Sequence, residues 1–286
     1  MTEPVTETPT ADSSKAAAVE QWTNDPCGST EVDFEIGSPE YFERLDAMRR
    51  DYAPWMDEAL GYANSSGMQV LDIGCGQGID LVRYARAGAI ATGIDLTPRH
   101  TEIARAHLVA AGLEATVVQG DAESLPFDSE SFDRVSSNGV LHHTPGIDAA
   151  LKEAHRVLRP GGEARIILYN KSSLHYWVNQ FLYSGLLKRG LRREGGMDGV
   201  LSAGVEVSNT GARPLVRVYS PRQTRRLLER AGFTDVRTEV SHFHAGDAFL
   251  YSVASRRIAR LREQSMLDRV GRRAGWYVTG IGRRSS

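Results

Sequence analysis

The sequence predicts an α/β fold in which a mostly parallel sheet has helices on both faces. Between residues 68 and 170, short apolar segments alternate with segments of helical periodicity, the pattern of successive βαβ units. A glycine-rich turn directly follows the first apolar segment, at the edge where such sheets bind ligands. The alternation resumes after residue 219, which predicts that the sheet continues there with further strands.

The composition is typical of a soluble globular protein. The 286 residues are 41% apolar and 24% charged, and this length suits one large domain with insertions. No run approaches the ~18 consecutive apolar residues of a membrane-spanning helix, and the first residues lack a secretory signal, so we expect a cytoplasmic protein. Cys27 and Cys75 alone exclude a disulfide framework or a structural zinc site built on cysteines.

The charge is distributed unevenly along the chain. The formal net charge is −2, which argues against a general nucleic-acid binder. Residues 1–60, however, hold fourteen acidic and four basic side chains, whereas residues 255–286 hold nine arginines and two acidic side chains. The near-neutral total is therefore the cancellation of an acidic beginning and a basic end.

The first 66 residues predict a tail followed by a helical cap. Residues 1–20 are rich in Thr, Ser, Glu and Ala without apolar periodicity, which is typical of a disordered tail. In residues 41–62, apolar side chains recur at helical spacings, and Pro54 should divide this segment into two helices. Residues 21–66 are therefore expected to form an N-terminal helical cap.

Residues 67–286 contain the expected sheet and its helices. The strands are expected at 68–73, 90–94, 115–119, 132–137, 164–169, 234–242 and 275–281. Helices are expected at 77–87, 98–111, 146–158 and after Ser220, with Pro221 at the first helical position and Gly232 at the end. Two insertions follow the fifth and sixth strands: 171–215, which starts with an amphipathic helix, and the helical, basic segment 246–273.

The strongest motif is VLDIGCGQG at residues 70–78. The first strand carries Asp72, and Gly74, Gly76 and Gly78 allow the backbone to pass close under a ligand beside the N–H groups of a helix N-terminus. Asp95 ends the next strand, at a distance along the chain that suits a carboxylate accepting from ribose hydroxyls. A dinucleotide site would need a small residue where Ile79 stands.

Five motifs in order over about 100 residues carry a family resemblance: VLDIGCGQG (70–78), GID (93–95), GDAESLPFDSESFDRV (120–135), NGVLHHTP (138–145) and EAHRVLRPGGEARI (153–166). With them the sequence resembles the class I S-adenosylmethionine (SAM)-dependent methyltransferases, in the branch of ubiquinone/menaquinone and many natural-product methyltransferases with a methyltransferase type 11-like domain. The resemblance implies a Rossmann-like, seven-stranded sheet whose last strand is antiparallel.

The resemblance also implies SAM as cofactor and a place for each site residue. The loop from Asp72 through Gly74, Cys75, Gly76, Gln77 and Gly78 would hold the aminoacyl and sulfonium part of SAM, and Asp95 would hold its ribose. Leu96 and Arg99 would flank the adenosine, and Asp121 and Ala122 would read the adenine. Asn138 and His143 would face the methionine end, and Tyr41 or Tyr52 would reach the cofactor from the helical cap.

Methyl transfer is an in-line displacement that needs positioning and placed charges more than covalent chemistry. A general base is needed only for an acceptor that loses a proton, and the candidates are His142, His143, Tyr169 and His175, of which the first two follow the fourth strand. We expect no metal, because His242 and His244 lack companions at ligand spacing.

The sequence therefore predicts a methyltransferase for a small, apolar acceptor of quinone, lipid or natural-product type, enclosed by the helical cap and an acceptor lid at 171–215. Two alternatives stay open: an enzyme of this fold that uses SAM without transferring methyl, and a catalytically silent SAM-binding regulatory protein. The arginines of 256–273 suit a solvated face, a peripheral contact with anionic lipid, or a phosphate-bearing acceptor. No nucleic-acid partner is expected.

Overall fold

The seven strands form one sheet in the order β3-β2-β1-β4-β5-β7-β6. The computed structural model describes residues 11–26, 29, 32–205, 211 and 213–286. The strands are β1 (Gln69–Ile73), β2 (Ile90–Asp95), β3 (Thr116–Gln119), β4 (Phe132–Asn138), β5 (Leu158–Tyr169), β6 (Thr234–Ser241) and β7 (Tyr277–Arg283). Strands β1 to β5 pair in parallel, and β7 runs antiparallel between β5 and β6, which confirms the predicted fold class.

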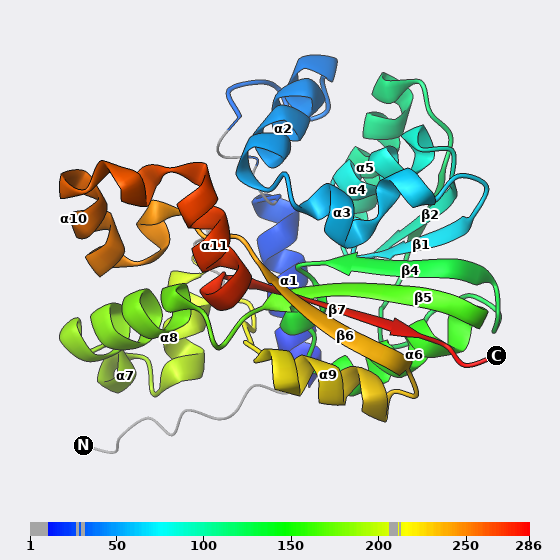
Figure 1. Cartoon of the computed structure of the whole chain (residues 1–286). Helices are drawn as coiled ribbons and strands as arrows, with labels where there is room; N and C mark the ends of the chain where they lie inside the picture. Colours follow the sequence, from blue (N-terminus) through cyan, green and yellow to red (C-terminus); the bar gives the residue numbers. More distant parts are fainter. Residues whose placement is uncertain (1–10, 27–28, 30–31, 206–210, 212) are drawn as a thin grey trace, which may run out of the picture.

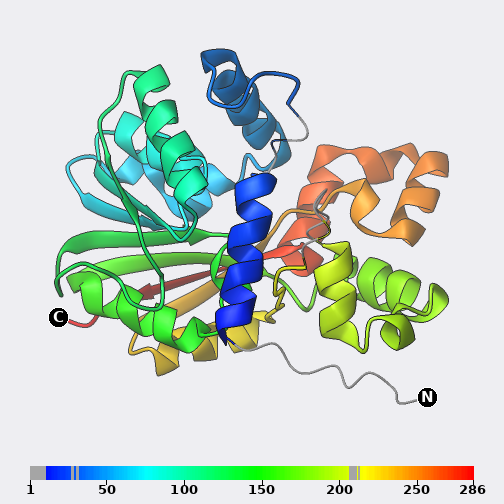
Figure 2. The same cartoon turned by 180° about the vertical axis from the view of Figure 1, so that it is seen from behind.

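Helices cover both faces of this sheet, as Figures 1 and 2 show. The long helices are α1 (Ala11–Asn24), α2 (Pro39–Tyr52), α5 (Pro98–Ala111), α6 (Ile147–Val157), α9 (Pro221–Arg230) and α11 (Gln264–Ala274). The shorter ones are α3 (Met56–Leu60), η2 (Tyr62–Asn64), α4 (Ile79–Arg86), η3 (Leu141–His143), α7 (Gly190–Arg193), α8 (Met197–Gly204), η5 (Ala245–Asp247), α10 (Phe249–Arg257) and η6 (Ala259–Arg262). A further helix, η4 (His175–Leu187), has the wider π-type hydrogen bonding.

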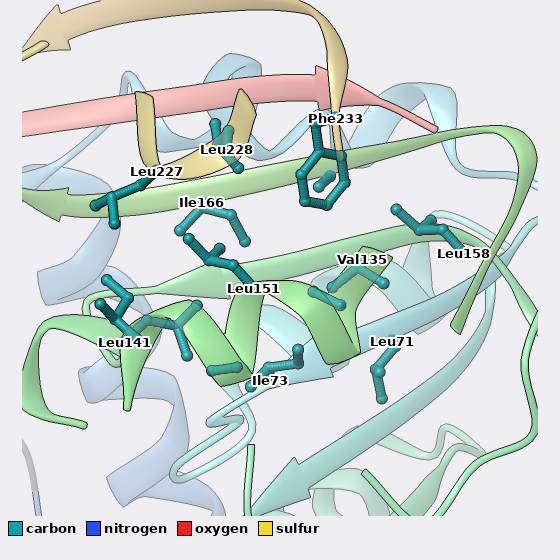
Figure 3. Close-up of a cluster of buried hydrophobic side chains, with 14 of the residues drawn as sticks. Leu71, Ile73, Val135, Leu141, Leu151, Leu158, Ile166, Leu227, Leu228 and Phe233 are labelled. Carbon is teal, nitrogen blue, oxygen red and sulfur yellow. The ribbon is translucent and has the colours of Figure 1, made fainter. Parts of the chain in front are cut away.

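Alternate strand residues supply the two cores. Leu71 and Ile166 pack against α6 and α9 in the cluster drawn in Figure 3, whereas their neighbours Val70 and Ile167 pack against α3 and α4 on the other face. This period of two places apolar side chains on both faces, which is why the strands are apolar along most of their length.

Three expectations are wrong in detail. Residues 11–20, expected to be disordered, form most of α1, while residues 1–10 lie outside the described part. β5 begins at Leu158 rather than at 164, because the turn at Gly161 is hydrogen-bonded to the Arg284 carbonyl. The segment 246–273, expected to be helical throughout, is divided into η5, α10, η6 and α11.

Helix α1 is held by distant contacts that local composition does not encode. Ala18 and Gln21 are buried, and Lys15 pairs with Asp121, which follows β3. The predicted break at Pro54 is confirmed, since α2 ends at Tyr52 and α3 starts at Met56.

Candidate functional site

A cavity of about 990 Å³ lies where β1, β2, β4 and β5 end. The carboxyl ends of the parallel strands lie at this edge, and residues of α1, α2 and the two insertions form the other walls of the cavity. Most of the site residues that the sequence predicts line it: Gly74, Cys75, Gly76, Gln77, Asp95, Leu96, Asp121, Ala122, Asn138, His143 and Tyr52.

The glycine turn after β1 needs its glycines for two different reasons. Gly74, Gly76 and Gly78 all have positive φ values, of 73°, 51° and 81°. A side chain on Gly74 would also meet the Val140 methyl groups at 2.4 Å, whereas one on Gly76 would meet nothing within 4 Å. Gly76 therefore borders open space, as a turn lying under a ligand must.

The backbone N–H groups of this turn are used within the protein. Those of Gly74 and Cys75 donate to the Ile94 carbonyl, at 2.7 and 3.1 Å, and that of Gly76 donates to the Asp95 carboxylate at 2.9 Å. These three N–H groups therefore do not form the donor cradle that the motif suggests.

Asp95 is a buried carboxylate that stays ionised. Besides Gly76 it accepts from the Thr97 N–H at 2.9 Å and lies 3.3 Å from His100 Nδ1. Burial alone would raise the pKa of Asp95, but the hydrogen bond and charge of His100 and the two backbone donors lower it below the usual value. Since Oδ2 accepts only the Gly76 bond among the described residues, it retains capacity for a ligand hydroxyl.

A second acidic group lies below the glycine turn. Asp80 accepts from the Tyr62 hydroxyl at 2.6 Å and from the Asn138 amide at 2.9 Å. Asp72 accepts from Ser136 Oγ at 3.0 Å, and its other oxygen is buried without a hydrogen-bond partner among the described residues. Burial and the neighbouring Asp80 raise the pKa of Asp72 well above its usual value. Of these groups, Asp80 and Asn138 line the cavity, where their mutual hydrogen bond fixes both side chains.

Helix α1 closes the opposite end of the cavity. Lys15 Nζ lies 2.7 Å from Asp121 Oδ2 and 2.8 Å from Glu123 Oε2. About two helical turns later, the Trp22 ring contacts His143 edge-on, with 5.9 Å between the ring centroids. The helix therefore covers the strand ends that carry Asp121 and His143.

Aromatic rings and histidines line the remaining part, which we call the aromatic end: Tyr52, Tyr169, His175, His244, Trp276 and Tyr277. Tyr169 stacks on Trp276 with centroids 4.6 Å apart, and His175 lies 4.5 Å from the same Trp276 ring. The hydroxyls of Tyr52 and Tyr277 are 3.3 Å apart. This end offers flat apolar surfaces with a few polar atoms, which suits a small apolar molecule.

Several predicted residues do not reach the cavity. Arg99 is exposed and pairs with Glu102. Asp72 in β1 and Gly78 at the start of α4 do not line the cavity. His142 is fully buried between His143 and Tyr169, and burial lowers its pKa far below the usual value, so its placement does not support a role as base. Tyr41 is also fully buried, and its hydroxyl donates to Gln77.

Other lining residues were missed by sequence reasoning. They are Lys15 and Trp22 on α1, Asp80 and His100 behind the glycine turn and Asp95, and Trp276 and Tyr277 at β7. Asp80 and His100 follow recognised motifs by two and five residues, a signal that could have been used. Cys27 lies outside the described residues, and within them no cluster of three His, Cys, Asp or Glu side chains could hold a metal ion.

His242, whose ring lies 4.3 Å from that of Tyr52 at the aromatic end, predicts that the folded protein loses stability in acid. Burial, together with the nearby His244 and His175, lowers the pKa of His242 to about 4, from the 6.5 that it has when unfolded. Since the folded pKa is depressed, the neutral ring's contribution is present above pH 6.5 and is lost as the pH falls toward 4. We expect His242→Asn, which tolerates the left-handed backbone at φ 65°, to lose less thermal stability over this interval.

Melting curves of wild type and the His242→Asn variant, recorded at pH 7.5 and at a series of lower pH values, check this prediction. If the melting temperature falls equally steeply with pH in the two proteins below pH 6.5, the assignment to His242 is contradicted. A similar melting temperature of the two proteins at pH 7.5 controls for the substitution itself.

The geometry agrees with comparisons to known proteins. Residues 71–166 match a family model described as a methyltransferase domain. An uncharacterized methyltransferase of Synechocystis sp. is 36% identical over 129 residues, covering 44% of this chain and 59% of that protein. A ubiquinone biosynthesis O-methyltransferase of Pseudomonas syringae pv. tomato is 34% identical over 123 residues, covering 43% and 52%. Over these residues the chain is similar to methyltransferases. It spans about half the length of the curated relatives that it matches.

Solved structures share the methyltransferase fold over nearly the whole chain. A Burkholderia thailandensis 1,6-didemethyltoxoflavin-N1-methyltransferase, solved with its substrate and S-adenosylhomocysteine, is 16% identical with a TM-score of 0.54, covering 99% of this chain and 93% of that one. The cyclase SpnF is 20% identical with a TM-score of 0.53, covering 97% of each chain. At these identities the likeness establishes the fold of the chain and nothing further.

Proposed function

We propose that this chain transfers a methyl group from SAM to a small acceptor bound at the aromatic end. One observation carries the proposal: the Gly74–Gly76 turn, the Asp95 carboxylate and the Asp121 carboxylate line a single cavity, in the arrangement that the family motifs imply. Three positions from separate parts of the sequence thus converge on one ligand.

The residues present fit this cofactor. Gly76 borders open space that a ligand backbone would fill, and Asp95 keeps an acceptor oxygen for a ribose hydroxyl. The Asp80 carboxylate lines the same cavity and is held there by Tyr62 and Asn138, which supports a positively charged group of the ligand beside it. SAM carries positive charge on its sulfonium and its amino group.

When bound, SAM supplies an electrophilic methyl group on a positively charged sulfur. The chain's residues would position and enclose: Asp95 orients the ribose, Asp121 the adenine, and α1 excludes water above them. Asn138, fixed by its bond to Asp80, would face the methionine end. We assign Arg99, which points to solvent, no role.

The aromatic end and the insertions support a small, apolar acceptor. Its walls come from three parts of the chain: Tyr52 from the helical cap, Val205 and His175 from the proposed 171–215 lid, and Asp247 from the second insertion. We propose the domain limits on this basis, with a cap at 21–66 and the methyltransferase domain at 67–286.

For an acceptor that loses a proton, His143 is the proposed base. Its Nδ1 lies 2.7 Å from the Leu215 carbonyl oxygen and so carries the ring proton, which leaves Nε2 as the basic nitrogen. We expect His143→Gln to lower kcat at least about tenfold with little change in SAM affinity. His142→Gln is the matched control, since that ring does not line the cavity, and equal losses in both variants would argue against a base.

Calorimetry with SAM and with its demethylated product tests the cofactor assignment. No binding by wild type, or unchanged binding by both Asp95→Ala and Asp121→Ala, would overturn it. A screen of quinone, phenol, lipid and polyketide-like acceptors, scored by release of demethylated cofactor, then tests turnover. Mass spectrometry of product and spent cofactor separates methyl transfer from other uses of SAM, and binding without turnover across the screen would favour a silent regulatory protein.

A further inference from the structure

Large apolar side chains gather on the outside of the two insertions. Twelve are exposed among the described residues, and eight of these lie between His175 and Ile258 on two helices, far too many for scattered surface residues. We call them the apolar surface: Trp177, Leu182, Tyr183, Leu186 and Leu187 on η4, Phe249 and Val253 on α10, and Ile258 directly after it. Leu187 is 70% exposed and Ile258 is 52% exposed.

The two helices form one lobe, although more than 60 residues separate them in sequence. The Tyr183 and Phe249 rings stack with their centroids 5.7 Å apart. The Phe249 N–H donates to Asn179 Oδ1 at 2.9 Å, and Asn179 Nδ2 donates to the Gly246 carbonyl at 3.3 Å. Figures 1 and 2 show α7, α8 and α10 together on the side of the molecule away from the sheet. The apolar surface is therefore continuous across both insertions.

Basic side chains accompany this surface, and acidic ones are missing from its segments. Residues 175–193 and 248–262 contain no Asp or Glu. They carry exposed cations at Lys188, Arg189, Arg192, Arg193, Arg256, Arg257 and Arg260. Within the described part of the chain, only Arg193 of these is paired with an acidic side chain, Glu194. Lys188 lies over the Tyr183 ring at 4.7 Å from its centroid.

We propose that the apolar surface docks this protein onto an anionic lipid bilayer. Aliphatic and aromatic side chains beside exposed Lys and Arg are the combination that inserts into the boundary between headgroups and acyl chains. A nucleic-acid surface would be dominated by stacking rings beside basic side chains, whereas five of the eight residues of the apolar surface are aliphatic. None of the helices in the described residues has the length and apolar character to span a bilayer, so the contact is peripheral.

The docked lobe also forms part of the cavity wall. His175 on η4 and Asp247 on η5 line the aromatic end, so docking would bring that end to the bilayer. The acceptor class is then a lipid-soluble molecule that partitions into the membrane. This extension to the acceptor rests on the proposed function, whereas docking itself does not.

Vesicle sedimentation with the full chain tests the docking. We expect binding to phosphatidylcholine vesicles that contain phosphatidylglycerol, and at least about tenfold weaker partitioning onto phosphatidylcholine alone. The variants Leu186→Ser with Leu187→Ser, and Arg256→Gln with Arg257→Gln, should each weaken binding to the anionic vesicles at least about tenfold. The matched controls are Ile90→Ser with Val109→Ser, which are exposed apolar residues elsewhere, and Arg225→Gln with Arg226→Gln on α9.

Three outcomes would overturn the proposal. The first is no vesicle binding by wild type, and the second is unchanged binding by both lobe variants while their melting curves show them folded. The third is concentration-dependent self-association in ultracentrifugation that only the lobe variants abolish, which would assign the surface to a second copy of the chain. Because the assay needs neither cofactor nor turnover, its failure would leave the proposed methyl transfer untouched.

Discussion

Asp95→Ala should weaken binding of SAM and of its demethylated product by about 100-fold or more. The substitution removes an ionised, buried acceptor that we assign to the ribose hydroxyls. A hydrogen bond to a charged group contributes about 1.5–3 kcal/mol, and about 1.4 kcal/mol corresponds to a factor of ten. One such bond at the upper end of this range accounts for the expected loss. Isothermal titration calorimetry measures it directly, and catalytic turnover should fall with it.

Two controls make this result interpretable. Asp95 also holds Gly76, Thr97 and His100, so melting curves must show that the variant is folded before its affinity is compared. Asp95→Asn keeps the shape without the charge and should fall between wild type and alanine. Asp148→Ala, which removes an exposed carboxylate paired only with Arg230, should bind as wild type does. Wild-type affinity in a folded Asp95→Ala variant would refute the ribose assignment.

Gly74→Ala should destabilise the protein by about 2–5 kcal/mol. Its positive φ costs a residue with a Cβ about 1–2 kcal/mol. The added methyl would also meet both Val140 methyl groups at 2.4 Å, an overpacking that costs about 1–3 kcal/mol. Chemical denaturation without cofactor measures the change in the free energy of unfolding.

Gly76→Ala is the matched control for this effect. It shares the positive φ, but its methyl would meet nothing within 4 Å, so it should cost only the backbone part, about 1–2 kcal/mol. The double variant Gly74→Ala with Val140→Gly removes the three closest atoms and should recover the difference. If Gly74→Ala and Gly76→Ala cost the same, the close packing of Val140 over the turn is not what constrains Gly74.

The sequence predicted the parts of the fold that carry local signals. Helix α5 has its expected limits because Pro98 starts it and Gly112 can end it in a left-handed conformation. The capping box at Ser220 and Gln223 likewise marks the start of α9. The strands lie within a residue or two of their expected places at nearly every end, since a buried parallel strand must be apolar on both faces.

What the sequence could not supply depends on contacts between distant residues. The residues around Lys15 do not indicate that it would pair with Asp121, more than 100 residues away, and so place α1 over the cavity. Likewise, Trp276 joins the aromatic end only because β7 inserts beside β5 and brings this ring onto Tyr169. The glycine turn and its two carboxylates were predictable because their spacing is local, whereas the walls that surround the acceptor are assembled by topology.

The bases of the two insertions are tied to each other at the sheet. The Asn170 N–H donates to the Trp276 carbonyl at 2.7 Å, that of Lys171 to Tyr219 at 3.2 Å, and that of Trp276 to His242 at 2.8 Å. Each inserted segment thus leaves and rejoins the sheet at points that are already joined, so changing its length costs little beyond loop closure. In evolutionary terms the insertions are an exchangeable module: a lineage can replace its acceptor wall and outer face together while the cofactor half keeps its geometry.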